Sequence, residues 1–185
     1  MAHLGYLRIK TSSEIDASPW GVQYLSRDYP HDLLLDRMGA SGAKWVRLST
    51  SWSSVEVEKG HYRWDLLDRL VDGLIEQGVD HILIGTGAGS HPAYHEFPAG
   101  YIYPPTDVPA ALDGYCRYAA ALVERYGDRV RHYEIYNEPN WPLFWRPQPD
   151  PEAYGLLVRR AGEAMLGARG DVRPELAGGS LAGVG

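Results

Sequence analysis

The chain has 185 residues, which is long enough for one well-cored domain and too short for two of ordinary size. Its composition is that of a globular protein, with 44% hydrophobic and 23% charged residues. A formal net charge of −6, with no block of like charge, argues against a nucleic-acid-binding protein, which needs a clustered basic face.

The amino-terminal sequence predicts no export signal. The segment from Met1 to Lys10 lacks a continuous apolar stretch and a small-residue cleavage site, and no apolar run approaches the length of a membrane span. As written, the sequence predicts a cytoplasmic protein without a membrane partner. The single cysteine, Cys116, excludes an internal disulfide framework, and its apolar helical surroundings favour a buried, unreactive thiol.

In chain order, the hydrophobic pattern predicts strands that alternate with helices. Strands are predicted at 19–25, 44–50 and 81–85, from 132 onward, and at 174–179. Helices are predicted at 30–40, 66–75, 111–126 and 152–168. Loops are predicted at 52–64, 87–109 and 141–151, and no hairpin or meander pattern is apparent.

This alternation predicts an α/β fold with a parallel sheet and right-handed crossovers. Two architectures remain open, a doubly wound sheet and a (β/α)8 TIM barrel. Long loops at the carboxyl ends of the strands favour the barrel. Since a full barrel takes about 250 residues, we expect residues 1–185 to form a single, incomplete barrel domain. It would hold about four βα units and the start of a fifth strand.

One strand ends in a conspicuous polar motif, since residues 132–140 read His-Tyr-Glu-Ile-Tyr-Asn-Glu-Pro-Asn. Pro139 cannot donate to a ladder and disfavours helical geometry for Glu138, so Glu138 is expected to be extended at the strand's carboxyl end. A partly buried carboxyl group beside the Asn137 amide suits general acid/base chemistry. The alternative is an ordinary loop or helix-capping carboxylate.

The stretch from Tyr133 to Trp141 resembles the fourth-strand signature of clan A glycoside hydrolases. It is particularly similar to the family of β-xylosidases and α-L-iduronidases and to related cellulase-like enzymes. Residues 45–49 resemble that clan's arginine-bearing strand, and residues 55–65 resemble the segment that leads into its second helix. The resemblance extends from about residue 20 to 179 and is most specific at Asn-Glu-Pro.

The resemblance implies hydrolysis of O-glycosidic bonds in a glycoside or an oligo- or polysaccharide, by a retaining mechanism that needs no cofactor. Asn137 would then bind the substrate 2-hydroxyl, and Glu138 would be the acid/base. The nucleophile, expected about 5–5.5 Å away, lies on the family's seventh strand, for which this chain has no counterpart. One hypothesis is therefore that the sequence is the amino-terminal part of a longer enzyme. The rival is a non-hydrolytic carbohydrate-binding or assembly protein built from half a barrel.

Two further polar sites are candidates for substrate binding. In the family, the residue matching Arg47 hydrogen-bonds the nucleophile. The alternative is that Arg47 forms a buried structural pair with Glu134. Glu134 is expected to be an interior carboxylate on the same strand face as Glu138. His91 and His95 have the i, i+4 spacing of metal ligands, but no third ligand is evident. We therefore predict no metal site and expect His91 to contact substrate.

Aromatic residues are concentrated in the predicted loops at the strand ends. Trp52, Tyr94, Trp141, Phe144 and Trp145 could stack on sugar rings, with ordinary loop packing as the alternative.

A glycine-rich stretch at 85–89 lacks the third glycine of a dinucleotide-binding loop and is predicted to be a turn.

An unclosed barrel leaves strand edges and part of an apolar interior uncovered, so this polypeptide alone is expected to self-associate. Analytical ultracentrifugation over a range of concentrations would measure this. A monodisperse monomer that melts cooperatively would contradict the expectation.

Overall fold

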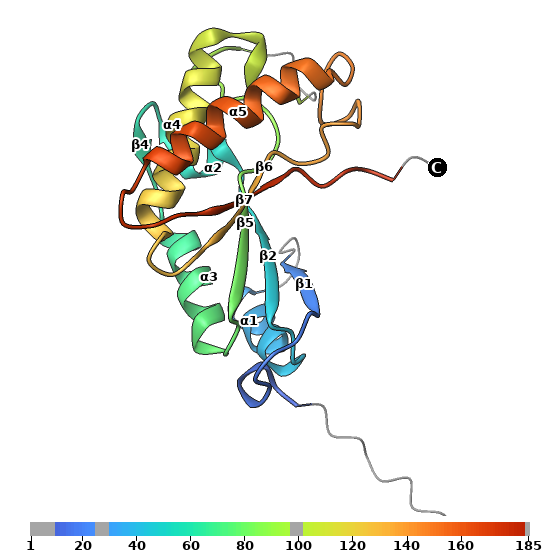
Figure 1. Ribbon diagram of the computed structural model, residues 1–185, viewed down its shortest axis with the longest axis vertical. Coiled ribbons are helices and arrows are strands. Elements are labelled where there is room, and N and C mark those ends of the chain that lie inside the picture. Colours follow the sequence, from blue (N-terminus) through green and yellow to red (C-terminus); the bar gives the residue numbers. More distant parts are fainter. Residues whose placement is uncertain (1–9, 25–29, 97–101, 184–185) are drawn as a thin grey trace, which may run out of the picture. The chain divides into compact units, whose positions relative to one another are not determined.

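The computed structural model describes residues 10–24, 30–96 and 102–183. Leu25, at the end of the first predicted strand, and residues 97–101, in the long predicted loop, lie outside the described residues. The fold is α/β, with five strands in a parallel sheet and helices between successive strands, as predicted (Figure 1).

The strands follow one another in the sheet in the same order as in the sequence, β1-β2-β5-β6-β7. Across its centre, Tyr133 lies opposite Ile84 on one side and Leu176 on the other. A doubly wound sheet would reverse the strand order at a switch point, whereas a barrel adds each new strand on the same side. The observed order therefore decides between the two predicted architectures in favour of an incomplete (β/α)8 barrel. The strand bounds are β1 Gly21–Tyr24, β2 Trp45–Ser49, β5 His81–Gly85, β6 His132–Ile135 and β7 Glu175–Gly178.

The predicted helices are also present, with bounds that differ by only a few residues. They are α1 His31–Ala40, α3 Asp65–Glu76, α4 Pro109–Tyr126 and α5 Pro151–Gly167. Helices α4 and α5 begin with proline, whose fixed φ suits the first helical turn. Asp150 caps α5 by accepting a 2.9 Å hydrogen bond from the Ala153 N–H. Two short 3-10 turns, η1 Ser12–Glu14 and η2 Pro105–Asp107, were not predicted.

The predicted loop at 52–64 is wrong, because this segment has regular structure. It contains a one-turn helix, α2 Trp52–Val55, followed by a small antiparallel hairpin of β3 Glu56–Glu58 and β4 His61–Tyr62. The hairpin turns at Gly60, which has a φ of +80° that glycine adopts without strain. The expectation that the chain has no hairpin is therefore wrong as well, and Gly60 was the local turn signal.

The chain divides into two compact units. Unit 1 comprises Met1–Arg47 and Asp65–Ile82, and unit 2 comprises Leu48–Trp64 and Leu83–Gly185. In unit 1, α1 packs on α3, and the two helices are joined at the surface by Arg69, which donates to both Asp32 oxygens. The buried Lys44 ammonium donates to the Gly78 carbonyl at 2.9 Å and to Asp80 at 3.2 Å.

Unit 2 is built around helices α4 and α5, which pack side by side (Figure 1). Its core is rich in aromatic side chains that are almost fully buried. These are Trp52, Tyr115, Tyr118, Tyr126, Tyr133, Tyr136 and Trp145.

The buried tyrosines predict a loss of stability at alkaline pH. Burial, reinforced by the negative charge of Glu56, raises the pKa of Tyr62 to about 12, and burial also raises the pKa of Tyr115 and Tyr133 above their usual range. Above about pH 10 the unfolded chain loses phenol protons that the folded chain keeps, so stability falls as pH rises from 10 toward 12.

Urea unfolding between pH 8 and pH 12, combined with ultraviolet titration of the phenolates, would test this expectation. The unfolded chain in urea is the reference. Tyrosines of the folded protein that titrate together with those of the unfolded chain would contradict it.

Candidate active site

The Asn137-Glu138 pair lies directly after β6, which pairs in parallel with β5 on one side and β7 on the other. The strand ends at Ile135, so both residues lie at its carboxyl end, where barrel enzymes carry their catalytic groups. Both side chains are half-buried. Within the described residues, the Glu138 carboxylate has no hydrogen-bonding or ion-pair partner, which leaves it available to a ligand.

The backbone after β6 forms a turn with two left-handed residues, Tyr136 with a φ of +72° and Glu138 with a φ of +47°. The predicted extended conformation of Glu138 is therefore wrong. Proline favours the extended region for the residue before it, so Pro139 alone does not account for this conformation, in which the Glu138 N–H donates to the Ser180 carbonyl at 2.8 Å. Non-glycine residues with positive φ are uncommon, cost about 1–3 kcal/mol each and occur often at functional sites.

Tyr136 is held by hydrogen bonds at both its main chain and its side chain. Its N–H donates to the Thr86 hydroxyl oxygen at 2.9 Å, and its own hydroxyl donates to the Phe144 carbonyl at 2.6 Å. The Thr86 hydroxyl also contacts the Tyr115 hydroxyl and lies 3.1 Å from the Glu134 carbonyl oxygen. These bonds, all within unit 2, keep the first left-handed residue in place.

Glu134 is an interior carboxylate, as predicted, with 2% of its surface exposed. Its Oε1 accepts a 2.7 Å hydrogen bond from the Ser180 N–H. The prediction that Glu134 shares a strand face with Glu138 is wrong, because β6 ends at Ile135 and strand alternation does not continue through the turn. Arg47 lies on β2 and is half-buried, and its role in substrate binding stays a prediction.

A second buried carboxylate, which the sequence analysis did not single out, organises the segment after β2. Glu56 is fully buried and accepts hydrogen bonds from the Trp52 indole N–H, from the Gly60 N–H at 2.7 Å and from the Tyr94 hydroxyl at 2.6 Å. Charged acceptors make strong hydrogen bonds, so Glu56 ties α2, the hairpin and the segment after β5 together.

His91 belongs to the same buried cluster. Its Nε2 lies 2.6 Å from the Glu56 carbonyl oxygen, and its Nδ1 accepts a hydrogen bond from the Ala93 N–H at 3.0 Å. Both ring nitrogens therefore bond to main-chain groups. Trp52 is 2% exposed. These environments are those of packing residues, and substrate contact by His91 or Trp52 stays an untested prediction.

The aromatic loop after β6 has one exposed and one buried tryptophan. Trp141 is 43% exposed and lies edge-on against Phe144, with ring centroids 5.4 Å apart. Trp145 is 1% exposed and packs between Tyr136 and Tyr154. Trp141 is therefore accessible for stacking on a sugar, whereas Trp145 supports the turn that carries Glu138.

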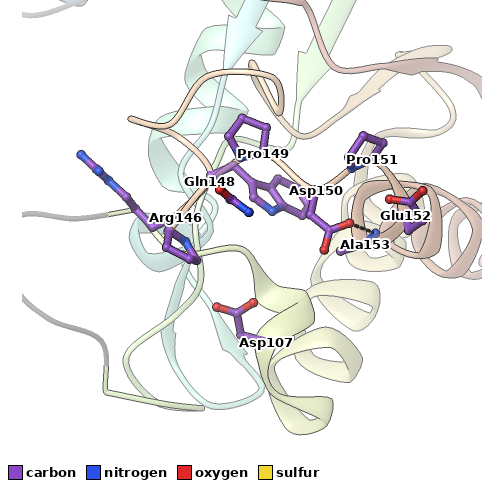
Figure 2. A pocket seen from close by; sticks show the side chains of 10 residues that line it. Asp107, Arg146, Gln148, Pro149, Asp150, Pro151, Glu152 and Ala153 are labelled. Atoms are coloured by element: carbon purple, nitrogen blue, oxygen red, sulfur yellow. Dashed lines mark hydrogen bonds between the residues drawn. The ribbon is translucent and has the colours of Figure 1, made fainter.

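A pocket of about 390 Å³ lies beside this loop, lined by Asp107 of η2 and by residues 145–153 (Figure 2). Asn137 and Glu138 are not among its lining residues. Burial raises the pKa of Asp107, the charge of His95 opposes the rise, and the Asp150 carboxylate adds to it. This pocket was not predicted from the sequence, and it is separate from the pair after β6.

Other predicted features have simple structural positions. Gly87 and Gly89 have positive φ values of 76° and 97°, which suits a turn. In the part of the chain that the structure describes, no group of three or more His, Cys, Asp and Glu residues is arranged to hold a metal ion. None of the helices described is long and apolar enough to cross a membrane.

Comparison with known proteins supports the resemblance seen in the sequence. A family model described as a β-galactosidase family of glycoside hydrolases matches residues 27–99, which is less than half of the chain. The search of curated proteins found no match.

Several solved structures of glycoside hydrolases have a similar fold. A family 39 glycoside hydrolase from Bacteroides cellulosilyticus WH2 is 23% identical, with a TM-score of 0.61, over 85% of this chain and 30% of that one. Endo-glycoceramidase II from Rhodococcus sp. is 18% identical, with a TM-score of 0.61, over 82% of this chain and 44% of that one. A GH5_18 protein from Streptomyces cattleya is 19% identical, with a TM-score of 0.56, over 80% of this chain and 38% of that one.

These matches define a class of fold, the TIM barrel of glycoside hydrolases, and they confirm the predicted resemblance. The chain spans less than half the length of each of these three proteins.

The Glu56 cluster predicts a large effect of a small substitution. Glu56→Gln keeps the shape of the side chain but turns one acceptor oxygen into a donor that faces other donors, so it should destabilise the protein by about 2–4 kcal/mol. Urea unfolding followed by circular dichroism measures the difference. Glu58→Gln, at an exposed position of the same strand, is the matched control. Equal unfolding midpoints for the two variants would contradict the structural role of Glu56.

Proposed function

We propose that this chain is part of a retaining glycoside hydrolase in which Glu138 is the acid/base. The observation that carries the proposal is the position of Glu138. Its carboxylate is half-buried, has no partner among the described residues and directly follows β6 beside Asn137. The family model and the folds of the similar structures support the same reaction class.

In the proposed mechanism, the protonated Glu138 carboxyl donates its proton to the glycosidic oxygen while the bond from that oxygen to the anomeric carbon breaks. A second carboxylate attacks the anomeric carbon and forms a covalent glycosyl intermediate. The ionised Glu138 then takes a proton from water, which hydrolyses the intermediate. The second carboxylate would come from a part of the protein outside these residues.

Asn137 is proposed to hydrogen-bond the 2-hydroxyl of the sugar. Hydrogen bonds to this hydroxyl strengthen in the transition state and supply several kcal/mol in retaining glycosidases. Arg47 would act from β2 by keeping the second carboxylate ionised.

The proposed ligand is a glycoside or an oligo- or polysaccharide. Among the similar structures, endo-glycoceramidase II was solved with a cellobiose-like isofagomine and with ganglioside GM3, and the GH5_18 protein with GlcNAc. The exposed face of Trp141 offers a surface on which a sugar ring can stack. This tryptophan also suits the rival function, a protein that binds carbohydrate without cleaving it.

Glu138→Gln in the complete protein separates the two functions. Turnover of aryl glycosides with poor leaving groups should fall by about 10²–10⁴-fold, because a poor leaving group departs only when its oxygen receives a proton from the acid. Activated leaving groups should be affected less. The control is Glu163→Gln, which removes an exposed carboxylate on α5.

Initial rates across a leaving-group series, with sugar binding measured by calorimetry, give the answer. Full activity in the Glu138→Gln variant would rule out the assigned acid/base. Sugar binding by a wild-type protein without turnover of any glycoside would favour the binding protein instead.

A further inference from the structure

The segment that follows β7, residues 179–182, is bonded to the turn that carries Asn137 and Glu138. Ser180 makes three of these bonds. Its N–H donates to Glu134 Oε1 at 2.7 Å, its carbonyl accepts from the Glu138 N–H at 2.8 Å, and its hydroxyl donates to Asn137 Oδ1 at 3.2 Å. Ser180 therefore contacts three groups: the Glu134 side chain at the end of β6, the side-chain amide of Asn137 and the backbone N–H of Glu138.

Further bonds fix the same segment on either side of Ser180. The Gly179 N–H donates to the Tyr154 hydroxyl at 2.6 Å. Asn140 and Ala182 exchange two hydrogen bonds, from Asn140 Nδ2 to the Ala182 carbonyl at 2.9 Å and from the Ala182 N–H to Asn140 Oδ1 at 2.8 Å. Ser180 is thus held from both directions along the chain, so its hydroxyl has a defined position relative to Asn137.

The bond from the Ser180 hydroxyl favours one of the two ways in which the Asn137 amide can face. The two ends of an asparagine amide have similar size, but one end accepts hydrogen bonds and the other donates them. Because Ser180 donates to Oδ1, the amide oxygen lies toward Ser180 and the Nδ2 donor lies on the other side.

We propose that Ser180 is a positioning residue that orients the Asn137 amide, so that Asn137 Nδ2 can donate a hydrogen bond to the oxygen of the substrate 2-hydroxyl. The consequence for catalysis rests on the function proposed above. The orientation itself does not depend on that function.

Ser180→Ala removes the hydroxyl and leaves both main-chain bonds of Ser180 in place. The side chain is exposed, so the substitution creates no cavity in the core. Ser180→Thr restores a hydroxyl and is the conservative rescue. Leu181→Ala is a matched control, because it shortens the exposed apolar side chain of the next residue and leaves the hydrogen bonds of this segment in place.

The first measurement is the side-chain amide resonance of Asn137 in ¹⁵N-asparagine-labelled protein, assigned by its loss in Asn137→Asp. Ser180→Ala should shift or broaden this resonance by exchange, and Ser180→Thr and Leu181→Ala should leave it close to the wild-type position. An unchanged resonance in Ser180→Ala would overturn the proposed orientation. This readout requires no turnover.

The second measurement is the ratio of kcat/KM for a glycoside to kcat/KM for its 2-deoxy analogue in the complete protein. Ser180→Ala should lower the ratio roughly three- to tenfold, the effect of one misdirected hydrogen bond. Ser180→Thr should keep the ratio, and Ser180→Ala should have no further effect in an Asn137→Ala background. An unchanged ratio in active Ser180→Ala protein would overturn the catalytic consequence. A wild-type protein without any turnover would instead overturn the proposed function, while the resonance still decides the orientation.

Discussion

The unusual backbone after β6 is the constraint on which the candidate site depends. Two non-glycine residues, Tyr136 and Glu138, have left-handed conformations within three positions of each other. Such a turn persists only when its surroundings determine it. Thr86, at the end of β5, holds the first residue, and Ser180, beyond β7, holds the second. The segments that directly follow the two strands flanking β6 therefore supply the bonds that place the proposed acid/base.

The same arrangement separates two glutamates that are close in sequence. Glu134 is buried and bonded to the Ser180 N–H, so it has a structural role at the end of β6. Glu138 is half-buried, and its carboxylate has no partner among the described residues. The turn between them takes Glu138 out of the strand pattern. A carboxylate left available beside an amide suits the acid/base half of the proposed two-carboxylate mechanism.

The sequence predicted those features that depend on local patterns. The bounds of β5 were predicted correctly because apolar residues 82–84 are followed by glycine, and the helices were found by their apolar periodicity. Features that depend on distant partners were missed. The left-handed Glu138 is bonded to the Ser180 carbonyl, 42 residues later in the sequence, and the buried His91 is bonded to the Glu56 carbonyl, 35 residues earlier. Single-residue patterns contain no information about such partners.

A crystal structure of the complete protein with a bound iminosugar would test the central claim most directly. The account predicts left-handed φ values at Tyr136 and Glu138, with a Glu138 carboxylate oxygen about 2.6–3.2 Å from the position of the glycosidic oxygen. It also predicts Asn137 Nδ2 beside the 2-oxygen. An iminosugar bound instead in the pocket between Asp107 and Asp150, with Glu138 directed away from it, would contradict the account.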